Sequence, residues 1–504
     1  MTQLRYDFIV VGAGSAGCAV AAGLQARDAG SILVIEAGPS DRAPLVRMPF
    51  GLVWMMGSKR RDWRFISTPQ VGLGGRQLAI PRGKMLGGSG SINSMVWFRG
   101  RMDDFDSWRV DGWSAQDVRP AFEEVEALIK PNRLPHPHSL TEGLHRMFAS
   151  NDNSAPSPEY ESAGVFHYNM RNGRRWSAAD AFLRPALAKG VQVLQGNSVK
   201  RIGFTGDRAS SIILGNGTEL HANKGIVLSA GSIGSPALLL ASGIGPADDL
   251  RAAGIDPRVN NEGIGANLHD HPAVGLHYQG GASGYGLALS QAHVWASAPL
   301  QWALSRRGVF ASPTVEGGAF FNAAGDGKAP DVQSHFIPFN LGWKGRRYEQ
   351  GRGYFADVCV CRPVSRGSLR LGRDGLEIDL GVLRDDADKD LLVKGLRRLR
   401  EIMAEADFGE HRAPEAFPGP DVQSDDALRD YVTNRAATAY HPVGTLRMGQ
   451  DSDAPVSKRL KLNGIGGLWI ADASIMPSVT SANTNAPSMM IGHRAGGFIA
   501  EDAA

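Results

Sequence analysis

The chain has 504 residues, of which 42% are hydrophobic and 21% are charged, and its formal net charge is +3. This length allows two or three domains with substantial cores. The nearly balanced charge gives no reason to expect a nucleic acid or an anionic membrane as partner. Only three cysteines occur, and they lack metal-ligand spacing, which argues against a disulfide framework and a zinc site. We expect no bound metal.

The uncharged stretch from Phe8 to Leu24 could be taken for a signal peptide or a membrane span. It is interrupted by glycines and is too short to cross a bilayer. A secretory signal also needs a basic start and a cleavage site, whereas Arg5 is the only basic residue before this stretch. We therefore expect a buried strand and helix here, in a cytoplasmic protein that has no membrane partner.

The same stretch predicts a βαβ unit that binds a dinucleotide. An apolar strand at 8–11 leads into Gly12-x-Gly14-x-x-Gly17, which is followed by an alanine-rich helix and a second apolar strand at 32–35. Gly12 would permit the tight turn, Gly14 would let the backbone approach a pyrophosphate, and Gly17 would let the helix pack closely on the sheet.

The residues around these glycines narrow the choice of cofactor. The helix that begins at Ser15 and Ala16 would direct free N–H groups and the positive end of its dipole at the phosphates. Glu36 ends the second strand, where a carboxylate can accept a hydrogen bond from a ribose hydroxyl. Ala37 follows it, and no Arg or Lys is placed to pair with a 2′-phosphate, which argues against NADP. The motif leaves both NAD and FAD open.

A second run of small residues, at 83–95, reads GKMLGGSGSINSM and includes Leu86 and Gly88. So many small residues together indicate backbone in close contact with a ligand. The apolar residues within the run are unusual for a flexible linker. Further along, a strand ends at Ala230 directly before a helix, which again would bring helical N–H groups to the cofactor.

The pattern changes in the middle of the chain and then returns. Residues from about 271 to 431 mix alternating strand patterns with an amphipathic helix. The last seventy residues again contain a short apolar strand that ends in an acidic residue, followed by a helix, as the first unit does. We expect an α/β protein, α+β in part, with a discontinuous Rossmann-like FAD-binding or NAD-binding domain and a smaller sheet-plus-helix substrate-binding domain. The expected ranges are 1–155, 190–270 and 436–504 for the cofactor domain, and 156–189 and 271–435 for the substrate-binding domain.

Three stretches together resemble the glucose-methanol-choline (GMC) oxidoreductase family, whose members are FAD enzymes that oxidise alcohols. They are the N-terminal dinucleotide motif, the run at 83–97 that continues to Asp106, and the run at 231–245, which reads GSIGSPALLLASGIG. Family-like ends also occur at 265–271, at 440–445 and at 472–477. The resemblance covers nearly the whole chain and selects FAD over NAD.

The resemblance implies a catalytic pair, His441 and Asn483. In this family the histidine of the His-Pro-x-Gly-Thr stretch faces the flavin N5 and the substrate hydroxyl. The chemistry fits, because alcohol oxidation needs a base for the O–H proton while a hydride leaves carbon for the flavin. Asn483 could donate a hydrogen bond to the developing alkoxide. His335 either lines the substrate pocket or is a buried strand residue, and His269 and His271 resemble scaffold.

The resemblance also implies how FAD is held. Asn93, Ser94 and Met95 would lie along the isoalloxazine, Val199 would meet the adenine through its backbone, and Asp472 with Ala473 would contact the pyrophosphate or the ribityl chain. Some family members bind FAD covalently through a histidine just before the asparagine of the first signature. Ile92 stands there in this chain and has no nucleophile, so we expect non-covalent FAD.

These features predict an FAD-dependent oxidase or dehydrogenase. The expected reaction converts a small primary alcohol, aromatic and furanic ones included, to the aldehyde, with His441 as general base and the flavin N5 as hydride acceptor. Oxygen and another electron acceptor both remain open. The alternatives are a GMC-fold flavoprotein with non-oxidative chemistry, such as a lyase or photodecarboxylase, and a catalytically silent FAD-binding scaffold.

Overall fold

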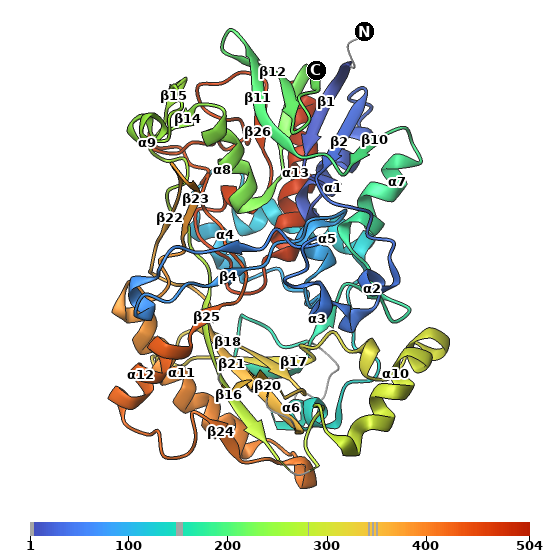
Figure 1. Ribbon diagram of the computed structural model, residues 1–504, viewed down its shortest axis with the longest axis vertical. Coiled ribbons are helices and arrows are strands. Elements are labelled where there is room, and N and C mark those ends of the chain that lie inside the picture. The colour runs from blue at the N-terminus through green and yellow to red at the C-terminus, as the bar shows by residue number, and fades with distance from the viewer. Residues whose placement is uncertain are drawn as a thin grey trace.

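A computed structural model describes residues 5–147, 155–280, 282–340, 343–344, 347–348 and 351–503 of the chain. Two seven-stranded sheets, each with its own helices, organise the molecule. Figure 1 shows one sheet in the upper half, close to both termini, and the other in the lower half. The α/β architecture expected from the sequence is therefore present.

The upper sheet is built on the predicted βαβ unit. Its strands run in the order β10-β2-β1-β13-β12-β11, and β26 also pairs with β13. Their bounds are β1 (Arg5–Val11), β2 (Ile32–Glu36), β10 (Gln192–Gln195), β11 (Val199–Thr205), β12 (Arg208–Leu214), β13 (Glu219–Leu228) and β26 (Leu468–Ile470). The strands β10, β2, β1, β13 and β26 pair in parallel. Parallel strands are covered on both faces, which is why their sequences are continuous apolar runs.

The two ends of the chain meet on this sheet. Helix α1 (Ser15–Gln25) packs along α13 (Asn485–Asp502), as Figure 1 shows. Their backbones approach closely at Gly23, where an added Cβ would lie 3.0 Å from the Cα of Gly496. The last helix therefore completes a domain that the first helix begins, so residues from the two ends can share one site.

The lower sheet is antiparallel. Its strands run in the order β24-β16-β21-β18-β17-β6, with β25 paired to β16. Their bounds are β6 (Ser162–Val165), β16 (Pro272–Gln279), β17 (Gly317–Phe321), β18 (Val332–Ile337), β21 (Gly353–Val360), β24 (Glu415–Phe417) and β25 (Ala437–Thr438). The amphipathic helix expected at 388–406 is α11 (Asp386–Glu405), which packs on β21 and β16. It lies beside α12 (Asp425–Arg435).

Two segments depart from the expected division of the chain. Helix α6 (Ser139–Met147), inside the range 1–155, packs against β6 and β17 of the lower sheet. A π-helical turn at Ala179–Leu183 and α7 (Arg184–Leu187), inside the range 156–189, pack against α1 of the upper half. Both segments are short and partly apolar, so their own residues do not reveal which sheet they cover.

The remaining helices of more than five residues surround these sheets. They are α4 (Met102–Ser107), α5 (Ala115–Ile129), α8 (Gly231–Ala241), α9 (Ala247–Ala252) and α10 (Ala292–Ser305). None of the helices in the part of the chain that the structure describes is long and apolar enough to cross a bilayer.

Candidate active site

A single cavity of about 1590 Å³ extends from the turn after β1 to His441 and Asn483. Most residues expected to bind the cofactor line it: Gly12, Gly14, Ser15, Ala16, Glu36, Ala37, Gly88, Asn93, Ser94, Met95, Val199, Ala230, Asp472 and Ala473. Gly17 and Leu86 do not. Ala16, beside Gly17, and Gly88, two residues after Leu86, line the cavity, whereas Gly17 and Leu86 themselves are buried. The nucleotide motif and the expected catalytic pair, more than four hundred residues apart in sequence, thus face the same space.

The turn between β1 and α1 is shaped to receive an anion. Gly12 has φ +101°, and a Cβ there would lie 2.5 Å from the backbone oxygen of Ser229. A Cβ on Gly17 would lie 2.0 Å from the oxygen of Gly12, so both glycines are required by packing. No side chain caps the N-terminus of α1. Its first N–H groups are thus available at the cavity wall, as phosphate binding requires.

Glu36 is a buried carboxylate at the end of β2. Its Oε2 accepts a hydrogen bond from the N–H of Ala13 (3.1 Å), and Oε1 accepts one from the N–H of Gly38 (2.8 Å). Burial raises its pKa to about 7, although these hydrogen bonds oppose the shift. Each carboxylate oxygen has a second lone pair, so Glu36 can still accept from a ribose hydroxyl at the cavity wall.

The glycine-rich run packs directly on the nucleotide motif. It forms a 3₁₀ turn at Gly88–Ser91, and a Cβ on Gly88 would lie 2.7 Å from the Cα of Gly14. The Asn93 side chain accepts from the N–H of Met95 (3.0 Å) and from Nη1 of Arg175 (2.7 Å). These contacts hold the backbone of the run as a rigid wall of the cavity.

Asp472 is used to join two elements. Its carboxylate accepts from the N–H of Gly231 (2.8 Å), the hydroxyl of Ser235 (2.5 Å) and the N–H of Ser474 (2.9 Å). It thereby fixes the end of β26 to the first turn of α8. Asp472 and Ala473 line the cavity, but the carboxylate itself is already engaged within the protein.

Two histidines from distant parts of the chain lie side by side. Strand β25 pairs with the start of β16, with Pro272 opposite Thr438, which brings the segment of His441 next to His271. The Oδ1 atom of Asp270 accepts from the N–H of His271 (2.7 Å) and from the N–H of His441 (2.8 Å). One buried carboxylate thus holds both backbones.

The hydrogen bonds of this pair define the tautomer of each ring. Nε2 of His271 lies 3.0 Å from the backbone oxygen of Thr480, which can only accept, so this nitrogen carries the proton. Nδ1 of His271 is then an acceptor, and Nδ1 of His441, 3.1 Å away, must be the donor. The lone pair of His441 is left on Nε2, which faces Asn483.

The amide of Asn483 lies between two imidazoles. Its Nδ2 is 3.2 Å from Nε2 of His441 and 3.4 Å from Nε2 of His335, and its Oδ1 accepts from Nε2 of Gln333 (3.1 Å). Nδ1 of His335 lies 3.1 Å from Oδ1 of Asp357 on the neighbouring strand. Two positions were expected for His335, a lining residue of the substrate pocket and a buried residue of a strand. Both descriptions apply, because His335 is a buried residue of β18 (Val332–Ile337) and also lines the cavity.

The pKa values of the three histidines differ in direction because their partners differ. Burial, followed by the neighbouring His271 and His335, lowers the pKa of His441 well below its ordinary value. Burial lowers the pKa of His271 to about 4. Burial also acts to lower the pKa of His335, but the charge of Asp357 and the hydrogen bond to it outweigh this, so the net shift is upward. The imidazole of His441 is therefore neutral near pH 7.

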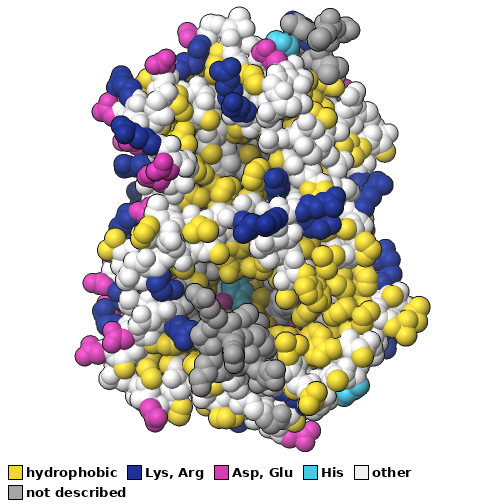
Figure 2. All heavy atoms as spheres, in the orientation of Figure 1, with side chains coloured by type: hydrophobic (Ala, Val, Ile, Leu, Met, Phe, Trp, Pro, Cys, Tyr) yellow, Lys and Arg dark blue, Asp and Glu magenta, His cyan; other side chains and the backbone are white. Residues whose placement is uncertain are grey.

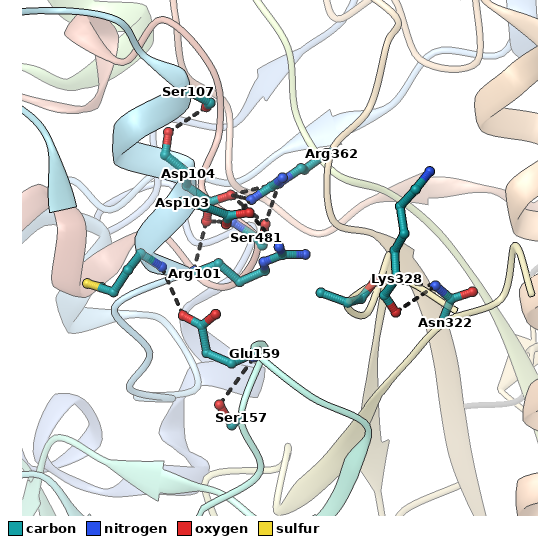
Figure 3. Close-up of polar contacts among 12 residues, drawn as sticks. Arg101, Asp103, Asp104, Ser107, Ser157, Glu159, Asn322, Lys328, Arg362 and Ser481 are labelled. Atoms are coloured by element: carbon teal, nitrogen blue, oxygen red, sulfur yellow. Dashed lines mark hydrogen bonds and ion pairs between the residues drawn. The ribbon is translucent and has the colours of Figure 1, made fainter. Parts of the chain in front are cut away.

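The loop that carries Thr480 and Asn483 is fixed from behind by a buried carboxylate. Figure 3 shows Asp104 of α4 between Arg362 and Ser481. Asp104 accepts from the N–H of Ser481 (2.7 Å) and from its hydroxyl (2.6 Å), and from Nε of Arg362 (2.8 Å). The carbonyl that orients His271 is thus held by contacts that themselves lie outside the cavity.

Sequence reasoning missed several of these residues. His271 looked like scaffold, and His269 is one, since its Nε2 accepts from the N–H of Val479 (2.9 Å). Thr480 and Gln333 belong to no recognisable motif. His271 lies 170 positions from His441 and 209 from Thr480, so no local signal in the sequence could have connected them.

A glycine-rich turn of the dinucleotide-binding type and a buried neutral imidazole that share one cavity fit a cofactor-dependent oxidoreductase. Models of the family described as GMC oxidoreductase match residues 6–273 and 363–492. The chain belongs to the GMC oxidoreductase family. This confirms the prediction of an FAD-dependent oxidoreductase that acts on alcohols.

Known proteins are similar to the chain over almost its whole length. Oxygen-dependent choline dehydrogenase from Rhizobium etli is 35% identical, and the match covers 98% of this chain and 96% of the relative. Pyridoxine 4-oxidase from Mesorbium loti superposes with a TM-score of 0.85 at 29% identity, covering 97% of this chain and 98% of the other. Formate oxidase from Aspergillus oryzae has a TM-score of 0.88 at 23% identity, covering 100% and 99%, and shares the fold.

Proposed function

We propose that the protein oxidises a small primary alcohol to the aldehyde with non-covalently bound FAD. One observation carries this proposal. Nε2 of His441, which bears a lone pair, and the N–H donor Nδ2 of Asn483 lie 3.2 Å apart in the cavity that begins at the nucleotide motif. An oxygen atom placed within hydrogen-bond distance of both would give its proton to one and accept a hydrogen bond from the other.

The described residues fit FAD as the cofactor. The uncapped N-terminus of α1 would bind the pyrophosphate, Glu36 would accept from a ribose hydroxyl, and the wall at Asn93–Met95 would support the ring system. When bound, FAD supplies the acceptor for the hydride that leaves the alcohol carbon. Ile92 lines the cavity beside this wall and offers no atom for a covalent bond.

Side chains of the protein accept the hydroxyl proton and stabilise the negative charge that develops on the alcohol oxygen. His441 accepts the hydroxyl proton on Nε2, because its Nδ1 proton is committed to His271. Its lowered pKa keeps it unprotonated and ready at neutral pH. Asn483 donates to the alcohol oxygen as negative charge develops there, and Gln333 holds the amide in that orientation.

The cavity wall suggests the class of alcohol. Trp295, Phe339 and Phe355 line the same space as the catalytic pair, which suits an aromatic or furanic substrate. The carboxylate of Asp357 also reaches the cavity but is bound by His335, so it is not free to pair with a cationic substrate. This favours a neutral alcohol, such as one resembling the substrate named for pyridoxine 4-oxidase, over a quaternary ammonium compound.

An anaerobic panel of alcohols, followed by flavin absorbance in the dark, tests the proposal. Bleaching of the flavin by a neutral primary alcohol is expected. His441→Ala should slow this reduction by about two to four orders of magnitude, the usual weight of general-base catalysis. His293→Ala, at an exposed histidine, is the matched control and should reduce normally.

Near-normal flavin reduction in His441→Ala would rule out this histidine as the base. Failure of the whole panel in the dark would instead support non-oxidative chemistry or a silent scaffold. The controlled tautomer of His441 argues against the scaffold, because FAD binding alone does not require a lone pair on Nε2. Admission of oxygen to the reduced protein then separates an oxidase from a dehydrogenase.

A further inference from the structure

Helix α10 presents an apolar face to solvent. From Ala292 to Ser305 it contains no Asp, Glu, Lys or Arg, and the buried part of the helix is limited to Ala298. Leu304 is 78% exposed, Leu300 is 63% exposed, and Leu289, in the turn before the helix, is 97% exposed. A surface helix normally carries charged residues on its outer side, so this helix is unusual.

Helix α3 (Leu52–Met55) extends the same apolar face. Trp54 and Val53 are each about half exposed, and Trp54 packs edge-on against Phe310, which follows α10 in the chain. Phe50 contacts both Trp54 and Trp295 of α10. We call the set Val53, Trp54, Leu289, Leu300 and Leu304 the apolar face. Figure 2 shows a broad hydrophobic area in this part of the molecule, at the lower right.

The two chain segments that carry the apolar face contain charges of one sign. The chain has no Asp or Glu at 42–61 or at 271–315, the two segments that contain the face. Exposed Lys59 and Arg60 follow α3, and Arg306 and exposed Arg307 follow α10. The whole-chain charge of +3 averages this local asymmetry away. An apolar surface whose own segments carry basic residues and no acidic ones is complementary to a surface that is apolar beneath and anionic at its boundary.

We propose that the apolar face docks on an anionic lipid bilayer, with α10 lying in the interface and the basic residues at the headgroups. A second copy of the chain fits less well, because a symmetric dimer would place the basic borders of both copies against each other. The membrane contact would not involve a spanning segment. This inference does not rest on the proposed substrate.

The contact would also bring the substrate cavity to the lipid surface. Val53 and Trp54 of the apolar face line the cavity, as do Leu287 and Trp295, which flank Leu289 and belong to the same segment. A molecule that partitions into the bilayer surface could therefore enter the cavity without crossing bulk water.

Vesicle co-sedimentation of the FAD-loaded protein tests the proposal. Binding to vesicles of phosphatidylglycerol and phosphatidylcholine in equal parts is expected, with weaker binding to pure phosphatidylcholine and a decrease at high salt. Leu289→Ser, Leu300→Ser and Leu304→Ser combined should lower the partition coefficient by about tenfold or more. The matched control is Leu128→Ser, at an exposed leucine of α5 that is 44% accessible, and it should bind like the wild type.

Flavin content and thermal unfolding, which do not depend on turnover, would establish that each variant is folded. Arg307→Gln should weaken binding to the anionic vesicles by roughly fivefold and leave binding to pure phosphatidylcholine unchanged. Absence of wild-type binding to anionic vesicles would overturn the proposal. A wild-type dimer that becomes monomeric in the triple leucine variant, as measured by light scattering, would also overturn it and assign the face to a second copy.

Discussion

His271→Ala should impair the catalytic base without touching the substrate. His271 is fully buried, and its Nδ1 accepts a hydrogen bond from the Nδ1–H of His441 (3.1 Å). Its Nε2–H donates to the backbone oxygen of Thr480 (3.0 Å), which fixes the tautomer of His271. Removing the ring deletes the acceptor that keeps the lone pair of His441 on Nε2. The tautomer with the proton on Nε2 cannot accept the hydroxyl proton of an alcohol there.

The size of the effect follows from the hydrogen bond that is lost. Leaving the buried Nδ1–H of His441 without a partner costs about 1–3 kcal/mol relative to the paired state. Because about 1.4 kcal/mol corresponds to a factor of ten, the rate of flavin reduction should fall roughly 5- to 150-fold.

Anaerobic stopped-flow measurement of flavin reduction across pH provides the assay. His271→Asn is the informative companion, since its side-chain oxygen can occupy nearly the position of Nδ1 and accept from His441. We expect the asparagine variant to remain within a few-fold of wild type. Equal losses in both variants would show that His271 acts only through packing. A wild-type rate and pH profile in His271→Ala would refute the tautomer argument.

Three further outcomes are expected. Glu36→Ala should weaken FAD binding by about 10- to 100-fold, the weight of a hydrogen bond to a charged group, as titration of the apoprotein by flavin fluorescence would measure; unchanged affinity would contradict its assigned role. Acid-precipitated protein should lose its yellow colour to the supernatant, because Ile92 cannot form a covalent link; colour in the pellet would contradict this. Burial lowers the pKa of His269 to about 3 and of His271 to about 4, from 6.5. The unfolded state therefore binds more protons than the folded state at these two histidines below pH 6.5, and each should lower the free energy of unfolding by up to about 1.4 kcal/mol per pH unit as pH decreases towards 4. Glu36 and Asp270, whose pKa values burial raises to about 7 and about 6, act in the opposite direction, so the measurement is the difference between wild type and His271→Asn in chemical denaturation; a difference that does not change with pH would contradict the burial argument.

The sequence predicted the nucleotide-binding half well because its signals are local. The apolar strand, the glycines and the helix of the first unit lie within about thirty residues, and β1, α1 and β2 follow that pattern. The last seventy residues have the same strand and helix patterns as the first unit, which predicted that they belong to the same domain. In the structure α13 packs along α1. These are cases in which periodicity and turn chemistry alone determine the element.

The placement of intermediate segments was beyond such reasoning. Helix α6 covers the lower sheet and α7 the upper half, in the reverse of the order expected from their positions in the chain. Leu140 and Leu144 of α6 are buried there, but an apolar stripe of this kind would fit either sheet. Long-range packing determines which half of the molecule each helix contacts, and no local sequence pattern in α6 or α7 indicates it.

The residue type also does not predict how each buried histidine behaves chemically. His335 and His441 line the cavity, and His271 is hydrogen-bonded to His441. The pKa of His335 is raised, whereas the pKa values of His271 and His441 are lowered. The difference comes from one carboxylate, Asp357, which bonds Nδ1 of His335. If that carboxylate lay against His441 instead, the raised pKa would favour the protonated imidazole near neutral pH, and the base would be occupied before the alcohol arrived. The proposed role of His441 as the proton acceptor therefore depends on Asp357 being bonded to His335 and not to His441.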